Sequence, residues 1–228
     1  QTCALPIYPE WMTLTVMDAK TGEILGTSTA PSFDPNIKNI QNYENPLIST
    51  TFEPGSTMKI YTYMCAMETG LYKGDDLYQS GSIQIGDDKV SDWNRYGWGM
   101  LSYDKGFEYS SNVAVSTMMQ TILDKQKLRS CLESYGFGEQ TGIELSNEAS
   151  GNISSFNYPI EVANASFGQG ITITAIQQLQ ALTIISNNGK MLKPHIVKKI
   201  VDSDSNEILY ETEKQESEQL VSEETVCS

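Results

Sequence analysis

Hydrophobic and polar positions form a few clear patterns along this chain. Residues 13–17 alternate like a strand, D-A-K-T-G-E follows as a turn, and Ile24 and Leu25 continue on the other side. This pattern predicts a β-hairpin with Gly22 in its turn. A second hairpin is predicted near the other end, where residues 196–201 and 208–210 flank the turn sequence D-S-D-S-N.

Three segments between these hairpins show helical spacing. The first follows a Pro-Gly pair, carries apolar residues at 60, 63, 64 and 67, and stops at Gly70. The second begins near Asn112. The third begins near Thr174, which forms a capping-box pattern with Gln177, and Gly189 closes it. Apolar residues at 176, 179, 182 and 185 predict that the third helix lies in the core.

Strands at both ends with helices between them predict an α+β fold in which helices pack on an antiparallel sheet. The connecting regions are less regular. Residues 30–55 are predicted to be loop, residues 71–106 turns with short strands that include 82–85, and residues 129–165 mixed loop and short helix.

Charge and length limit the kinds of partner. The net charge of −14 argues against nucleic acid or an anionic membrane surface. Nine acidic residues and one lysine lie between Asp202 and Thr225, and we expect this stretch to be a solvated, partly mobile end. No apolar stretch approaches the ~18 residues of a membrane span, so we expect a soluble segment, with any membrane anchor in a longer parent.

The cysteines and the termini add little to the fold. Cys3, Cys65, Cys131 and Cys227 lack metal-ligand spacing and do not resemble a disulfide framework, so Cys65 is expected to be a buried thiol. Residues 1–7, Q-T-C-A-L-P-I, resemble a translated sequencing adapter, and residues 226–228 could be the same adapter in another frame. We therefore expect a partial domain at 8–225, and neither a metal nor a cofactor.

The first predicted helix carries a candidate nucleophile and base. Ser56 and Lys59 lie three residues apart in E-P-G-S-T-M-K, which places them on one helix face. The helix N-terminus favours a developing anion at Ser56. The same field and partial burial should lower the pKa of Lys59 toward that of a usable base.

Similar short patterns occur elsewhere in the chain. Ser102-Y-D-Lys105 also reads S-x-x-K, but in a turn-rich stretch where we expect no helix to align the pair. Among four S-x-N matches, Ser110-S-Asn112 leads directly into a predicted helix. The K-T-G at 20–22 is best interpreted as the hairpin turn. His195 has no visible partners and is expected to be structural or exposed.

Several ordered landmarks resemble the transpeptidase domain of class B penicillin-binding proteins, most like the division-type enzymes of low-GC Gram-positive bacteria. They are D-A-K-T-G-E-I-L (18–25), P-S-F-D-P-N (31–36), E-P-G-S-T-M-K (53–59), D-W-N-R-Y-G-W-G (92–99), Y-S-S-N-V-A (109–114), Y-G-F-G-E-Q-T-G-I (135–143), S-F-G-Q-G-I-T-I-T (166–174) and N-G-K-M-L-K-P-H-I-V (188–197). The combination also matches the S-x-x-K and S-x-N elements of that fold family.

The resemblance implies roles for matching residues. Ser56 would attack a D-alanyl-D-alanine stem peptide, with its own backbone N–H in the oxyanion hole, and Lys59 would be the general base. Ser110 would relay the proton to the leaving group. Asn112 would donate to Lys59 and to the substrate amide. β-Lactams would be covalent inhibitors.

Other residues have weaker claims to substrate contact. Ser111 lies within the S-x-N element. Trp98 is either a wall of the cleft or, with Trp93, a packing residue. Gly168 and Gln169 belong to a G-Q-G that either cradles an anion or forms a tight loop below the site.

The family pattern is incomplete here. A catalytic K-T-G strand would follow N-G-K-x-x-K-P, but none follows His195 in these 228 residues. We therefore predict that the fragment is inactive or poorly active. A serine β-lactamase, or a penicillin-sensing or scaffold domain of the same fold, stays open as an alternative. For the full-length parent the resemblance implies divisome or glycosyltransferase partners and a single-pass membrane anchor with the catalytic domain outside.

Overall fold

The computed structural model describes residues 9–40 and 42–227, so the predicted adapter segment at 1–7 lies outside the described residues. The helices are α1 Pro46–Ser49, α2 Lys59–Met67, α3 Tyr103–Glu108, α4 Asn112–Thr121, α5 Lys125–Ser134, α6 Pro159–Ser166, α7 Ala175–Ser186 and α8 Glu223–Cys227, with a 3-10 turn, η1, at Gly55–Met58. The strands are β1 Met12–Met17, β2 Ile24–Ala30, β3 Thr51–Phe52, β4 Leu77–Gln79, β5 Ser82–Ile85, β6 Asp88–Ser91, β7 Met100–Ser102, β8 Ile173–Thr174, β9 Lys190–Leu192, β10 Lys199–Val201, β11 Ile208–Glu211 and β12 Glu216–Gln219.

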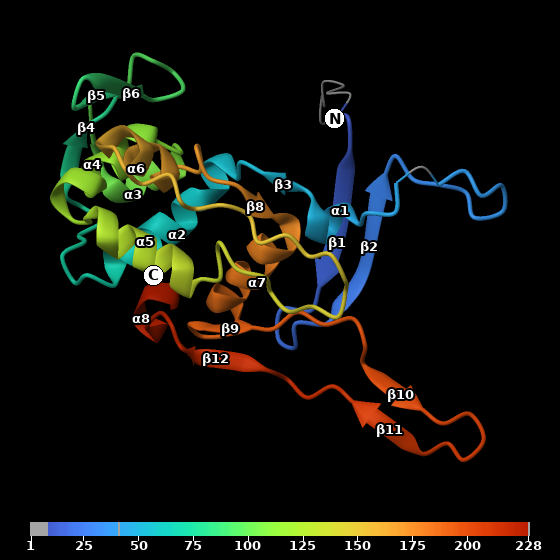
Figure 1. Ribbon diagram of the computed structural model, residues 1–228. Helices are drawn as coiled ribbons and strands as arrows, with labels where there is room; N and C mark the ends of the chain where they lie inside the picture. The colour runs from blue at the N-terminus through green and yellow to red at the C-terminus, as the bar shows by residue number, and fades with distance from the viewer. Residues whose placement is uncertain (1–8, 41, 228) are drawn as a thin grey trace, which may run out of the picture.

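The strands pair only in antiparallel twos among the described residues: β1–β2, β3–β8, β4–β7, β5–β6, β9–β12 and β10–β11. The predicted α+β class is therefore confirmed, but the two terminal hairpins do not join in one sheet. In Figure 1 the β1–β2 hairpin stands at one side of the helical body and the β10–β11 hairpin projects away from it. The outer edge of β1 has no strand partner in the described part of the chain.

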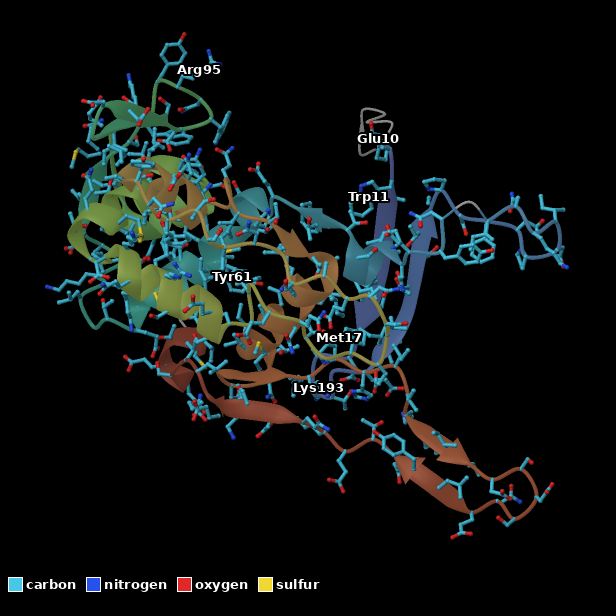
Figure 2. The ribbon with its side chains drawn as sticks, viewed as in Figure 1. Glu10, Trp11, Met17, Tyr61, Arg95 and Lys193 are labelled. Carbon is cyan, nitrogen blue, oxygen red and sulfur yellow. A yellow bond between two sulfur atoms is a disulfide. The ribbon has the colours of Figure 1, made fainter. Side chains whose placement is uncertain are left out.

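The first hairpin forms as its pattern predicts, and K-T-G makes its turn. The Asp18 carboxylate accepts the N–H groups of Lys20 (2.8 Å) and Thr21 (3.0 Å), which closes the turn. Gly22 has a φ of 81° and lies against the backbone of Lys193, where Figure 2 shows Lys193 beside the base of the hairpin. His195 is 9 % exposed, and its N–H donates to the Gly22 carbonyl (3.0 Å), so its structural role is confirmed.

The three long predicted helices correspond to α2, α4 and α7. The Thr174–Gln177 capping box at the start of α7 is present. Leu182, however, is 39 % exposed, so its predicted burial is wrong. An apolar residue does not itself determine whether another element covers its face of the helix.

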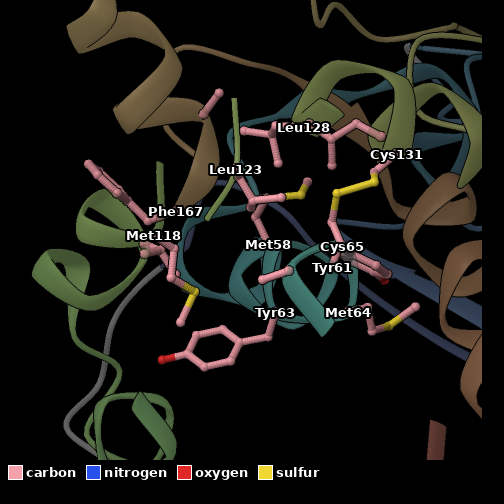
Figure 3. Packing of buried hydrophobic residues seen from close by; sticks show 14 of the residues in the cluster. Met58, Tyr61, Tyr63, Met64, Cys65, Met118, Leu123, Leu128, Cys131 and Phe167 are labelled. Atoms are coloured by element: carbon pink, nitrogen blue, oxygen red, sulfur yellow. A yellow bond between two sulfur atoms is a disulfide. The ribbon is translucent and has the colours of Figure 1, made fainter. Parts of the chain in front are cut away.

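A single apolar cluster surrounds α2. Met58, Tyr61 and Cys65 are completely buried there, and residues of α4, α5 and α6 pack around them (Figure 3). Tyr61 lies edge-on to Phe137 with ring centroids 4.9 Å apart. The helix that carries Lys59 is therefore held on several sides.

A disulfide joins α2 to α5, which corrects the expectation of a free Cys65 thiol. Cys65 and Cys131 are 66 residues apart in sequence, and their Cα atoms lie 6.0 Å apart. Only the packing of α2 on α5 brings them together, so their sequence spacing could not reveal the bond. Cys227 is a free, exposed cysteine.

The acidic stretch near the C-terminus is more ordered than expected. It contains β11, β12 and α8, and β12 pairs with β9. Glu216 accepts from Lys190 (2.9 Å) and Lys214 (3.0 Å), and these contacts lower the pKa of Glu216 to about 2. The expectation of a partly mobile end overlooked this pairing with lysines.

Candidate active site

Ser56 and Lys59 come together where η1 continues into α2. The Lys59 ammonium nitrogen, Nζ, donates to Ser56 Oγ at 2.8 Å. Ser56 is exposed, whereas Lys59 is only 2 % exposed. The Pro-Gly pair starts the turn, and Gly55 has a φ of 55°, a conformation that favours glycine. The geometry thus pairs an accessible hydroxyl with a buried amine.

Burial changes the acid–base chemistry of Lys59. The pKa of its amine falls to about 8, because burial penalises the charged form, while the negative charge of Asp92 acts in the opposite direction. A fraction of Lys59 is therefore neutral near physiological pH. This direction agrees with the sequence-based expectation, although burial rather than the helix field is its main cause.

Ser110 completes the group of hydroxyls around Lys59. Lys59 Nζ lies 3.0 Å from Ser110 Oγ and 2.8 Å from the Ser110 carbonyl oxygen. Ser110 lies between α3 and α4 and has a φ of 55°, which is unusual for a residue other than glycine or asparagine. This backbone conformation, which sequence did not reveal, accompanies the contact of both Ser110 oxygens with the same amine.

The competing pair Ser102–Lys105 is not arranged for catalysis. Contrary to expectation, α3 begins right after Ser102. Ser102 Oγ instead caps this helix by accepting the backbone N–H of Lys105 (3.3 Å), and Lys105 Nζ pairs with Glu108 at 2.7 Å. The predicted absence of a helix was therefore a poor reason to reject Ser102 and Lys105 as a catalytic pair. The better reason is that both side chains make other contacts.

Asn112 and Ser111 differ from the roles predicted for them. Asn112 Nδ2 donates to the Ser91 carbonyl (3.3 Å), and within the described residues no hydrogen bond joins it to Lys59. Ser111 is completely buried and caps α4 by accepting the Ala114 N–H (3.0 Å), so its predicted substrate contact is wrong.

Asp92 is a buried residue beside the site that sequence reasoning did not single out. It is 1 % exposed and accepts from Ser111 Oγ (2.7 Å) and the Val113 N–H (3.1 Å). It stands at the head of D-W-N-R-Y-G-W-G, so its place in a landmark was the only signal available.

Trp93, Trp98 and Tyr109 form an aromatic cluster that includes the residue before Ser110. Trp98 lies 5.8 Å from Trp93 and 5.0 Å from Tyr109, centroid to centroid. Trp93 is 72 % exposed, donates its indole N–H to the Tyr109 carbonyl (3.2 Å) and packs against Trp98. A role of Trp98 in the wall of the cleft stays a prediction. Arg95 lies farther out on the same loop, at the tip labelled in Figure 2.

The G-Q-G loop lies directly against the turn that carries Ser56. The Gly55 N–H donates to the Gly168 carbonyl (3.0 Å), and a Cβ on Gly168 would collide with the Gly55 backbone. Gln169 is exposed, and the Gly170 N–H donates to the Glu53 carboxylate (2.9 Å). The tight-loop interpretation of this segment is therefore favoured over an anion cradle.

The arrangement of Ser56, Lys59 and Ser110 suits an acyl transfer, and comparison with known proteins agrees with it. The family described as the penicillin binding protein transpeptidase domain matches residues 12–228. The chain belongs to this family. The likeness rests on almost the whole described chain rather than on the S-x-x-K motif alone.

Individual relatives support the same assignment. Stage V sporulation protein D of Bacillus subtilis is 33% identical over 227 residues, which cover 96% of this chain and 35% of that protein. Other matching relatives carry the name peptidoglycan D,D-transpeptidase. The chain thus spans about a third of the length of the curated relatives it matches.

Solved structures confirm the penicillin-binding protein fold. Penicillin binding protein 2X from Streptococcus thermophilus superposes with a TM-score of 0.83 at 33% identity, covering 94% of this chain and 32% of that one. Penicillin binding protein 3 from Mycobacterium tuberculosis, complexed with ampicillin, gives 0.81 at 30% identity, covering 95% and 48%. In the described part of our chain, no helix has the length and apolarity to cross a bilayer.

Proposed function

We propose that this chain is the catalytic core of a serine D,D-transpeptidase that cross-links peptidoglycan stem peptides and is acylated by β-lactams. One observation carries the proposal: Lys59 Nζ contacts both Ser56 Oγ and Ser110 Oγ. A single buried amine can therefore take a proton from one hydroxyl and pass one on through the other.

The proposed reaction has two halves. Neutral Lys59 accepts the Ser56 hydroxyl proton as Oγ attacks the carbonyl carbon between the two terminal D-alanines. The C–N bond then breaks, the leaving D-alanine amine takes a proton through Ser110, and an ester to Ser56 remains. An amine of a second stem peptide attacks this ester, forms the new amide bond and releases Ser56 with its proton restored.

Local structure supports charge stabilisation at Ser56. Its backbone N–H lies in the first turn of a helical segment, where N–H groups lack partners inside the helix. The proposal assigns this N–H to one half of an oxyanion hole. Asn112, at the first position of α4, is assigned to the substrate amide rather than to Lys59. It lies two residues after Ser110, and its side-chain amide contacts Ser91 instead of Lys59.

We also propose that the 228 residues acylate slowly. In the described residues the outer edge of β1 is unpaired, and Met12, Leu14 and Val16 are more than half exposed. A strand that carried K-T-G would supply the second oxyanion N–H and contacts to the substrate carboxylate. Acylation by a fluorescent penicillin as rapid as that of an intact penicillin-binding protein would contradict this part.

A serine β-lactamase is the main enzymatic alternative, and the lifetime of the penicilloyl adduct separates the two. The transpeptidase proposal predicts an adduct that lasts for hours once formed, because within the described residues no carboxylate is hydrogen-bonded to Ser56 Oγ or Lys59 Nζ, where it could activate a deacylating water. Mass spectrometry after removal of free penicillin measures the lifetime. Loss of the adduct within seconds would favour the lactamase.

A sensor or scaffold role is the non-enzymatic alternative. Intact Ser56, Lys59 and Ser110 contacts argue against a decayed site. In a cell that depends on the parent gene, Ser56→Ala should abolish growth or division without loss of the protein. Normal division with that variant would support a scaffold.

The parent protein is proposed to work at the cell surface. The same family assignment supports a single-pass anchor outside these residues, an extracellular catalytic domain, and partners in the divisome or among glycosyltransferases. Protease accessibility of this domain in intact spheroplasts tests the location: cleavage is expected, and protection would contradict it.

A further inference from the structure

The turn that presents Ser110 to Lys59 is closed by backbone hydrogen bonds, from the Ser110 N–H to the Phe107 carbonyl (2.9 Å) and from the Ser111 N–H to the Gly106 carbonyl (2.8 Å). Ser110 has a left-handed backbone conformation, with a φ of 55°, and its two oxygens both face the amine. Such a conformation costs roughly 1–3 kcal/mol for an ordinary residue and persists only where surrounding contacts hold it. The side chain of the neighbouring residue, Ser111, adds further contacts that link this turn to Asp92 and to α4.

The Ser111 hydroxyl both donates and accepts a hydrogen bond. It accepts the Ala114 N–H (3.0 Å) and donates to Asp92 Oδ1 (2.7 Å), so the hydrogen has a defined direction. The same Asp92 oxygen accepts the Val113 N–H (3.1 Å). The carboxylate therefore binds one backbone N–H at the start of α4, that of Val113, as well as the hydroxyl of the residue after Ser110.

Asp92 is also fixed from the opposite side. The second carboxylate oxygen, Oδ2, accepts the Gly81 N–H (2.8 Å), and the backbone N–H of Asp92 donates to the Gly81 carbonyl (3.0 Å). Three donors thus meet one carboxylate that is 1 % exposed. An asparagine there would place an amide NH₂ against at least one of these donors, because it has a single acceptor oxygen.

We propose that Asp92 is a positioning residue of this active site: its buried carboxylate fixes the Ser110–Ser111 turn, and through that turn the two Ser110 oxygens that contact Lys59. The inference deepens the proposed function, on which its catalytic meaning rests. Asp92 itself makes no contact with the reacting hydroxyl of Ser56 in the described structure.

Two titratable groups respond to the charge of Asp92. It raises the pKa of Lys59 against the larger effect of burial. On β4, Tyr78 has a pKa raised to about 12, mainly by burial and in part by Asp92, so Tyr78 stays neutral during a titration near pH 8. Lys59 is therefore the group whose titration reports on Asp92.

The test compares Asp92→Asn with Asp88→Asn in the 228-residue protein. Asp88 begins β6, the strand that Asp92 follows directly, but it is exposed, so it is a matched control. The pKa of Lys59 is measured by NMR with 13Cε-labelled lysine, assigned through Lys59→Arg. Asp92→Asn should lower the Lys59 pKa below about 8, and Asp88→Asn should leave it unchanged.

Hydrogen exchange provides the structural half of the test. Amide exchange at Val113 and Ala114 should become roughly ten- to a hundredfold faster in Asp92→Asn, since a buried acceptor is lost. It should not change in Asp88→Asn. Should Asp92→Asn fail to fold, Ser111→Ala keeps the charge of Asp92 but removes its hydrogen bond to residue 111. Faster exchange of the Ser110 amide, which donates to the Phe107 carbonyl (2.9 Å), is expected there.

Unchanged Lys59 titration and unchanged exchange in Asp92→Asn would overturn the proposal, as would unchanged exchange of the Ser110 amide in Ser111→Ala. Faster amide exchange in Asp92→Asn without a change in the Lys59 pKa would mean that Asp92 is a purely structural residue. That result would also overturn the proposal. None of these measurements needs a reaction with penicillin. Failure of the proposed transpeptidase function therefore remains distinguishable from failure of this inference.

Discussion

At the scale of single residues, the contrast between Ser56 and Lys59 is the feature with the most chemical consequence. The nucleophile is open to solvent, and the amine that contacts it is almost completely buried. Burial would be unfavourable for an ammonium group, but it brings the pKa of Lys59 into the range of a general base. The site therefore accepts a cost in stability to obtain a reactive pair.

The lowered pKa of Lys59 predicts how acylation depends on pH. Below about pH 8 the amine is increasingly protonated and cannot take the Ser56 proton, so the rate should rise with pH and level off above that value. Single-turnover acylation by a fluorescent penicillin between pH 6 and 9.5 measures this. Lys59→Arg, which stays protonated throughout, should be slower by roughly 10²–10⁴. A rate independent of pH would contradict the role of Lys59.

At the scale of elements, the contact between the G-Q-G loop and η1 positions Ser56. Gly168 and Gly170 both have positive φ, at 81° and 72°, but only Gly168 is against another backbone. Both alanine substitutions should cost about 1 kcal/mol for the backbone conformation. Gly168→Ala should cost at least about 2 kcal/mol more and slow acylation, because Gly55 must move. Urea unfolding measures both variants, and equal losses would contradict the contact.

The disulfide between α2 and α5 is the other feature at this scale. It closes a loop of 66 residues, for which chain entropy predicts a contribution of about 4 kcal/mol. Reductant should therefore lower the urea midpoint of the wild type but not of a Cys65→Ser/Cys131→Ser protein. Cys227→Ser, which removes the exposed free thiol, is the matched control and should behave as wild type. A wild-type midpoint insensitive to complete reduction would contradict the bond.

At the scale of the whole molecule, local patterns were enough to predict the hairpins and the long helices. Gly22, Thr174 and Gly189 mark element ends through backbone chemistry that acts within a few residues, so sequence alone could place them. The contact between Ser56 and Lys59 was predictable for the same reason, because a spacing of three residues places both side chains on one face of a helical segment. The family resemblance pointed to Ser110 as a proton relay, and the structure brings its Oγ within 3.0 Å of Lys59 Nζ, while the relay role stays a prediction.

Features that depend on distant segments were the ones that sequence did not supply. Cys65 meets Cys131 only because α2 packs on α5, and Asp92 meets Ser111 only because the β5–β6 hairpin covers the start of α4. The expected Asn112–Lys59 contact was wrong because Asn112 instead contacts the end of β6. The spacing of residues along the chain does not show which distant segments come into contact. The order of the landmarks nevertheless indicated the fold that creates these contacts.

The central claim is that Ser56 is the residue acylated, with Lys59 as its base. Prolonged incubation of the 228-residue protein with excess benzylpenicillin, followed by proteolysis and mass spectrometry, tests it most directly. The account predicts one slowly formed penicilloyl adduct on the peptide that contains Ser56, absent from Ser56→Ala and unaffected in Ser102→Ala. An adduct on Ser102 or Ser110, or an adduct that persists in Ser56→Ala, would contradict it.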